Sequence, residues 1–139
     1  MNDFQIKNLI SAALEARRAS YSPYSGFSVG AALLTASGEI FGGCNVEVGG
    51  HSATCCAERT AIFKAVSQGY RDFTAIAVTG GPDSGPVAGC YPCGVCRQAM
   101  AEFCNDDFIV IVAVDDENWR KFHLKELMPY RFDEGEVNL

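Results

Sequence analysis

The sequence predicts an α/β protein in which helices cover the faces of a β-sheet. Short segments rich in β-branched, aromatic and aliphatic residues alternate along the chain with segments whose apolar residues recur every three or four positions. Strand, helix, strand, helix, strand in this order implies βαβ crossovers, and hence helices packed on a sheet. The length of 139 residues, 48 % of them hydrophobic, suits one globular domain over residues 1–139.

The first predicted elements are an amphipathic helix and two strands. Residues 3–19 carry apolar side chains at mostly three- and four-residue spacing, which predicts the helix. A segment rich in turn formers, 21–26, leads into residues 27–34, whose Phe, Val, Ala and Leu content predicts a strand. The dipeptide Ser37-Gly38 offers a tight reversal into a second strand at 40–44.

The remaining elements continue the alternation of helices and strands. They are a loop at 45–54, a helix at 56–68, a strand at 73–79, a Gly/Pro loop at 80–89, a helix at 93–103, a strand at 108–114 and a short helix before Pro129, followed by an irregular end. Gly69 follows the first of these helices, as is common beyond a helix C-terminus. The run 108–114 is almost continuously apolar, which is typical of a buried strand.

Charge and cysteine content narrow the classes of function. The formal net charge is -6, from 11 Lys and Arg against 17 Asp and Glu, so we expect no nucleic acid partner. The N-terminus lacks a basic and apolar leader and no apolar run is long enough to cross a bilayer, so we expect a cytoplasmic protein without a membrane partner. Seven cysteines in a reducing compartment are expected to be metal ligands or buried thiols.

Two cysteine-containing stretches, Cys55-Cys56-Ala57-Glu58-Arg59 and Pro92-Cys93-Gly94-Val95-Cys96, carry the predicted chemistry. Each stands at the start of a predicted helix, where free N–H groups and the helix dipole stabilise thiolates. Three thiolates suit tetrahedral zinc and leave one position for water, whose pKa zinc can lower to about 7. Glu58, as a non-ligand, would then carry protons, and Arg59 would offset the negative charge of three sulfurs.

Other interpretations of these residues stay open at this point. A CxxC pair is common, and an acid in the first turn of a helix ordinarily interacts with the dipole. Spacing to Glu58 favours Cys56 over Cys55 as the ligand, because a helix turns about 100° per residue and both cannot face one metal. In a rival hypothesis, Cys55 or Cys90 completes a closed four-sulfur site, and the domain is a structural zinc module that binds a protein partner.

The combination of motifs resembles the zinc-dependent cytidine and deoxycytidylate deaminases, in the version whose zinc ligands are all cysteines. Most of the chain shares the likeness to the small, homotetrameric cytidine deaminases. It rests on Cys56-Ala57-Glu58-Arg59-Thr60-Ala61, on Pro92-Cys93-Gly94-Val95-Cys96, on Ser22-Pro23-Tyr24-Ser25-Gly26-Phe27-Ser28-Val29-Gly30-Ala31-Ala32 and on Gly43-Cys44-Asn45-Val46-Glu47. This resemblance implies a three-layer α-β-α sandwich around a mixed sheet of about five strands.

The same resemblance implies an activity and a partner. Cytidine and deoxycytidine would be hydrolysed to uridine and deoxyuridine through a zinc-activated water, as a step of pyrimidine salvage. The active sites would be shared between subunits of a homotetramer. The same chemistry on another aminopyrimidine nucleoside such as blasticidin is the alternative. A nucleotide or an RNA base is less expected, because the chain is acidic and Glu47 would repel phosphate.

The resemblance also implies roles for individual residues. It assigns zinc to Cys56, Cys93 and Cys96, proton transfer to Glu58, the ribose hydroxyls to Asn45 and Glu47, the wall of the base pocket to Phe27, a backbone bond to the base carbonyl to Ala57 and a contact with the neighbouring subunit's substrate to Phe132. An amide and a carboxylate separated by one residue in an extended segment project from the same face, which suits a diol. The chain departs from the family pattern at Val48-Gly49-Gly50-His51 and at Tyr91.

Overall fold

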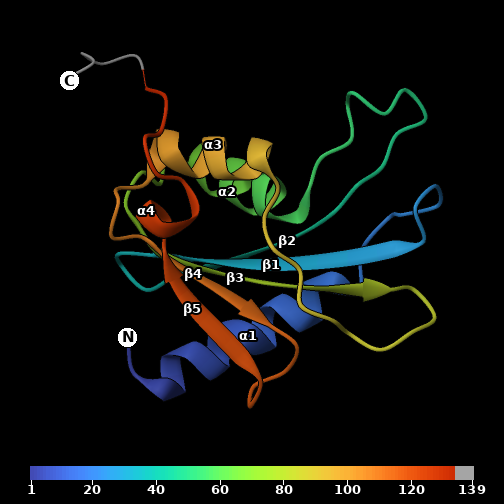
Figure 1. Cartoon of the computed structure of the whole chain (residues 1–139), viewed down its shortest axis with the longest axis horizontal. Coiled ribbons are helices and arrows are strands. Elements are labelled where there is room, and N and C mark those ends of the chain that lie inside the picture. Colours follow the sequence, from blue (N-terminus) through green and yellow to red (C-terminus); the bar gives the residue numbers. More distant parts are fainter. Residues whose placement is uncertain (134–139) are drawn as a thin grey trace.

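A five-stranded mixed sheet lies between two layers of helices in the computed structural model, which describes residues 1–133 (Figure 1). Its elements in chain order are α1 (Asp3–Arg17), β1 (Phe27–Thr35), β2 (Ile40–Cys44), α2 (Ala57–Ser67), β3 (Phe73–Pro82), α3 (Gly94–Phe103), β4 (Ile109–Ala113), β5 (Trp119–His123) and α4 (Leu124–Leu127). The predicted domain also includes residues 134–139, which lie outside the described residues.

The strands are ordered β2-β1-β3-β4-β5 across the sheet. Among the five strands that the structure describes in residues 1–133, only β3 and β4 pair in parallel, through the crossover helix α3, as a parallel pair requires. The three other pairs are antiparallel. Between β1 and β2 the chain reverses at Gly38, whose φ of 101° lies in the region that favours glycine. The sheet is therefore mixed, as the resemblance implied.

Helices cover both faces of the sheet, with α1 on one face and α2 and α3 on the other (Figure 1). Because side chains alternate along a strand, Ala75 and Ala77 of β3 pack in the α1 layer, while Ile76 and Val78 pack in the α2 and α3 layer. The predicted three-layer α-β-α sandwich is confirmed. Within residues 1–133, no helix combines the length and apolarity needed to span a bilayer.

A glycine sets the depth at which α2 lies on the sheet. A Cβ built on Gly43 of β2 would lie 2.5 Å from Ala61 N and 2.6 Å from Ala57 O, so only glycine allows this approach of helix to strand. The first turn of α2, which carries Glu58 and Arg59, is thereby held directly against the edge of the core.

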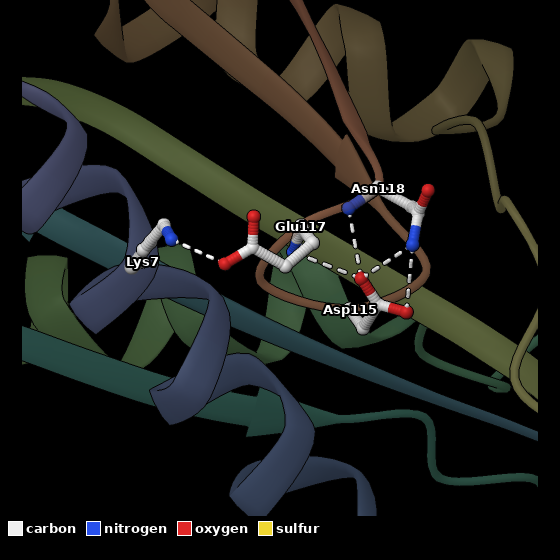
Figure 2. A network of polar contacts seen from close by, with 4 residues as sticks. All are labelled: Lys7, Asp115, Glu117 and Asn118. Carbon is white, nitrogen blue, oxygen red and sulfur yellow. Dashed lines mark hydrogen bonds and ion pairs between the residues drawn. The ribbon is translucent and has the colours of Figure 1, made fainter.

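Strand β5 was not predicted from the sequence. Its five residues include Arg120 and Lys121, and such charges are common on an edge strand but hide its pattern. A turn joins β4 to β5. In this turn, Asp115 Oδ1 accepts hydrogen bonds of 2.8 Å from the backbone N–H groups of Glu117 and Asn118 (Figure 2). Lys7 of α1 binds Glu117 Oε1 at 2.5 Å and so links this turn to the first helix.

Candidate active site

Three cysteine sulfurs meet where α2 and α3 begin. Cys56 is the N-cap residue of α2, Cys93 is the N-cap residue of α3, and Cys96 lies in the first turn of α3. An N-cap side chain points toward the third residue of its helix, which is why a CxxC pair at a helix start brings both sulfurs together. The three Sγ atoms lie within 4.8 Å of one another, and those of Cys56 and Cys93 are 3.9 Å apart.

This geometry fits a zinc ion. Four-coordinate zinc with Zn–S bonds of about 2.3 Å holds its sulfurs roughly 3.8 Å apart, close to the separation of Cys56 and Cys93. Among residues 1–133, the group of converging ligand atoms contains neither Cys55 nor Cys90. Cys55 instead exchanges two backbone hydrogen bonds of 2.9 Å with Val46. The structure thus assembles a three-sulfur centre rather than the closed four-sulfur site of the rival hypothesis.

Arg59 supplies positive charge to this centre. Its Nη2 donates to Cys56 Sγ at 3.4 Å and to the Thr54 carbonyl at 3.4 Å. A hydrogen bond from Cys96 and the Arg59 guanidinium together lower the pKa of Cys56 to about 5, although burial opposes the charge. Burial acts against the charge on Arg59 as well, yet its hydrogen bonds to Cys56 and Cys96 raise its pKa. Thiolate and guanidinium therefore stabilise each other.

Glu58 is a buried acid beside the sulfurs. It is the second residue of α2 and only 3 % exposed. Burial raises its pKa to about 7, and the Cys56 thiolate acts in the same direction. A carboxyl group with such a pKa exchanges protons readily near neutral pH, as a general acid and base must.

Asn45 lies just after β2, with nearly all its hydrogen-bonding capacity in use. Its Oδ1 accepts from the Val29 N–H at 2.9 Å and from the Ser20 hydroxyl. Its Nδ2 donates to the Phe27 carbonyl at 2.8 Å. An amide nitrogen carries two N–H groups, so one remains for a ligand.

Glu47 faces the turn that precedes β1. Its Oε1 accepts from the backbone N–H groups of Tyr24, at 3.0 Å, and of Ser25, at 3.1 Å. A hydrogen bond from the Ser25 side chain, with these two, lowers the pKa of Glu47 despite its burial. The carboxylate is therefore charged at neutral pH. Val46 pairs with Cys55, which places Asn45 and Glu47 beside the start of α2.

The other predicted substrate contacts lie at the start of β1 and α2 and in the tail. Phe27 is half-buried, and a Cβ on Gly80 would lie 3.0 Å from its ring. Ala57 is the first residue of α2, where backbone N–H groups lack a partner within the helix. Phe132 is 70 % exposed, and its carbonyl accepts from Gln98 Nε2 at 3.0 Å. Its ring thus projects from the surface.

The structure also places residues at the site whose roles the sequence did not indicate. Arg97 of α3 donates from Nε to the Pro92 carbonyl and from Nη1 to the Leu127 carbonyl, both at 2.8 Å, and so ties the loop before Cys93 to the tail. Ser20 donates a hydrogen bond to Asn45, whereas the sequence around it indicates only the turn at residues 21–26. Such contacts join distant segments, so no local spacing reveals them.

Fold and site together define an α/β/α protein with a three-cysteine metal centre and a neighbouring buried acid. The cytidine and deoxycytidylate deaminase zinc-binding region is the family model that matches, over residues 4–112. A cytidine deaminase of Sporosarcina psychrophila is 44 % identical over 133 residues, which are 96 % of this chain and 95 % of the relative. The chain belongs to the cytidine and deoxycytidylate deaminase family, and zinc is the metal of this family's site.

A solved structure and a relative of different activity complete the comparison. The crystal structure of a cytidine deaminase from Burkholderia pseudomallei superposes with a TM-score of 0.81 at 44 % identity, covering 90 % of this chain and 97 % of that one. A blasticidin-S deaminase of Bacillus cereus is 34 % identical over 110 residues, which are 75 % of this chain and 76 % of the relative. Both the resemblance inferred from the motifs and the predicted fold class are thereby confirmed.

Proposed function

We propose that this protein hydrolyses cytidine and deoxycytidine to uridine and deoxyuridine, with release of ammonia, as a cytoplasmic enzyme of pyrimidine salvage. The observation that carries the proposal is Glu58, a buried acid two residues after one of three converging thiols. Zinc bound by Cys56, Cys93 and Cys96 supplies a Lewis acid that makes water a nucleophile near neutral pH. Cytidine deaminases related to this chain over nearly its whole length support the substrate.

Glu58 is the proton carrier in this reaction. It takes a proton from the attacking water and delivers protons to N3 of the pyrimidine and to the amino group that leaves from C4. Water thus adds at C4, the C4–N bond breaks, and ammonia departs. A pKa of about 7 allows Glu58 to accept and return these protons without a large energetic penalty. Arg59 offsets the negative charge of the sulfurs through its hydrogen bond to Cys56.

The sugar is bound by groups of complementary polarity. Asn45 has an N–H to donate, and Glu47 carries a charged carboxylate that accepts. A sugar hydroxyl can accept from the Asn45 N–H or donate to the Glu47 carboxylate, so hydroxyl groups suit both residues. A phosphate would be repelled by Glu47. Phe27 lines the base pocket, and the backbone N–H of Ala57 binds the base carbonyl. This arrangement favours a nucleoside over a nucleotide or a nucleic acid.

Relative turnover of four substrates tests the proposal. Metal-replete enzyme should convert cytidine and deoxycytidine rapidly, as followed by the fall in their ultraviolet absorbance. Cytidine monophosphate should react more slowly, because Glu47 opposes its phosphate. Blasticidin should also react slowly. No turnover of the two nucleosides by zinc-loaded protein would refute the proposed activity, and a preference for blasticidin would reassign the substrate.

We also propose a homotetramer whose subunits share their active sites. Phe63 of α2, Val95 of α3 and Phe132 are large apolar side chains exposed on the isolated chain, and packing against another subunit would remove them from water. Phe132 lies on the tail after α4, where its carbonyl accepts from Gln98 of α3, and its ring would reach the neighbouring site. Arg97 and Gln98 anchor the tail that presents it.

Replacing Phe132 by alanine should raise KM for cytidine severalfold, because a ring contact with the nucleoside is lost, and should leave the zinc content unchanged. Steady-state kinetics, metal analysis and sedimentation measure the three quantities. Phe4→Ala is the matched control, since Phe4 is 78 % exposed on α1 and far in sequence from the site residues. An unchanged KM in a tetrameric Phe132 variant argues against a shared site.

A further inference from the structure

Residues 20–26 run beside Asn45 and Glu47 and bind both side chains. The Tyr21 N–H donates to the Asn45 carbonyl at 3.0 Å, and the Glu47 N–H donates to the Tyr21 carbonyl at 2.9 Å. At one end of the segment, the Ser20 hydroxyl donates to Asn45 Oδ1. At the other end, backbone N–H groups of the turn bind the Glu47 carboxylate. One short stretch of chain thus holds both groups that are proposed to meet the sugar.

The Ser20 hydroxyl is one of three neighbours that hold the Asn45 amide in its orientation. A side-chain amide can turn over, exchanging its oxygen and nitrogen, unless its neighbours distinguish the two ends. At Asn45 the oxygen end meets two donors, the Val29 N–H and the Ser20 hydroxyl, and the nitrogen end meets the Phe27 carbonyl. A turned amide would set its nitrogen against the Val29 N–H and its oxygen against the Phe27 carbonyl oxygen. The group that Asn45 keeps for a ligand is therefore its second N–H.

Ser20 is itself held in place by a polar cluster behind it. Its Oγ lies 3.4 Å from Ser22 Oγ, and buried Ser22 donates to Asp83 Oδ1 at 3.1 Å. Ser28 donates to the same carboxylate oxygen, and the Asp83 N–H donates to the Gly26 carbonyl at 2.9 Å. Asp83, beyond the end of β3, thus fastens the segment to the sheet at its centre.

We propose that Ser20 is a positioning residue for the sugar, which holds an Asn45 N–H toward a sugar hydroxyl and thereby selects nucleosides that carry this hydroxyl. The inference rests on the proposed function, because it takes Asn45 as a sugar ligand. Ser20 touches Asn45 and not the reacting atoms, so it should affect binding of the sugar and leave the chemical step unchanged.

Ser20→Ala tests this role. The variant should raise KM for cytidine, and the inhibition constant of uridine, by about tenfold, the factor expected for one lost hydrogen bond of ~1.4 kcal/mol. The turnover number and the inhibition constant of 2′,3′-dideoxyuridine should stay unchanged, because that analogue lacks the hydroxyl groups. A loss of equal size for both inhibitors, or no loss for uridine, would overturn the inference.

Two variants separate positioning from general damage to the fold. Ser20→Thr keeps the hydroxyl and should restore the affinity for uridine, since Ser20 borders a cavity of about 320 Å³ that has room for a methyl group. Ser37→Ala removes a serine hydroxyl in the turn after β1 and should change neither inhibition constant. If Ser20→Ala does not fold, a threonine variant that binds uridine weakly counts against the inference. Wild-type protein without cytidine turnover would instead refute the proposed function.

Discussion

Glu58→Gln is expected to lower kcat by about a thousandfold, within the range that a positioned general acid and base contributes. Glutamine has nearly the same shape and forms hydrogen bonds, but it can neither take a proton from water nor pass one to the leaving amino group. Because Glu58 is no part of the sulfur cluster, the variant should keep its zinc. Absorbance assays on cytidine and metal analysis of the same preparation measure both quantities.

The matched control is Glu102→Gln, which makes the same chemical change at an exposed position of α3. It should leave kcat and zinc content at their wild-type values. A Glu58 variant that retains nearly full activity would remove Glu58 from the mechanism. A variant that loses zinc would show that the carboxylate supports the metal centre instead.

Cys56→Ala is expected to abolish activity through loss of zinc. The cluster offers three sulfurs, and two remaining thiols from a single helix hold the ion far more weakly. The Arg59 guanidinium would also lose its thiolate partner in a partly buried position. Metal analysis after dialysis should therefore find no bound zinc, and the cytidine assay should find no turnover. Both properties should be lost although the variant differs from wild type by one small side chain.

Cys55→Ala provides a sharp control, since it alters the adjacent residue of the same type. Cys55 is outside the group of converging sulfurs, so this variant should bind zinc and turn over cytidine as wild type does. Loss of zinc in Cys55→Ala, or four sulfur ligands in the X-ray absorption spectrum of the wild-type protein, would favour the structural zinc module over the enzyme.

The place of each sulfur at a helix start could be predicted because it depends on local geometry, whereas the meeting of the two helices depends on the fold. Cys93 and Cys96 stand at the N-cap and in the first turn of one helix, and Cys56 has the same place on another, so helix geometry alone brings each sulfur to a helix start. The structure moves Cys56 and Cys93 just outside their helices, which begin one residue later than predicted. Each of these two thiols therefore belongs to an N-cap residue with extended backbone and not to the helix itself.

The sheet could be predicted only in part, because pairing between distant strands overrides local signals. Strand β3 continues through Gly80 and Gly81 to Pro82, where the sequence predicts a loop, since Phe27 and its neighbours pair with these residues. Strand β5 is stabilised by pairing with β4, which its own composition does not indicate. The contacts of Asn45 likewise depend on segments that only the folded chain brings together.

The position of the sulfur cluster between two helices has a consequence for folding. Cys56 and Cys93 are 37 residues apart in the chain, and the loop between them contains all of α2 and β3. A metal ion held by both helices would close this loop in the folded chain. Because the unfolded chain offers no assembled site, metal affinity adds directly to the free energy of unfolding. The metal ion of the active site would thus also stabilise the domain against unfolding.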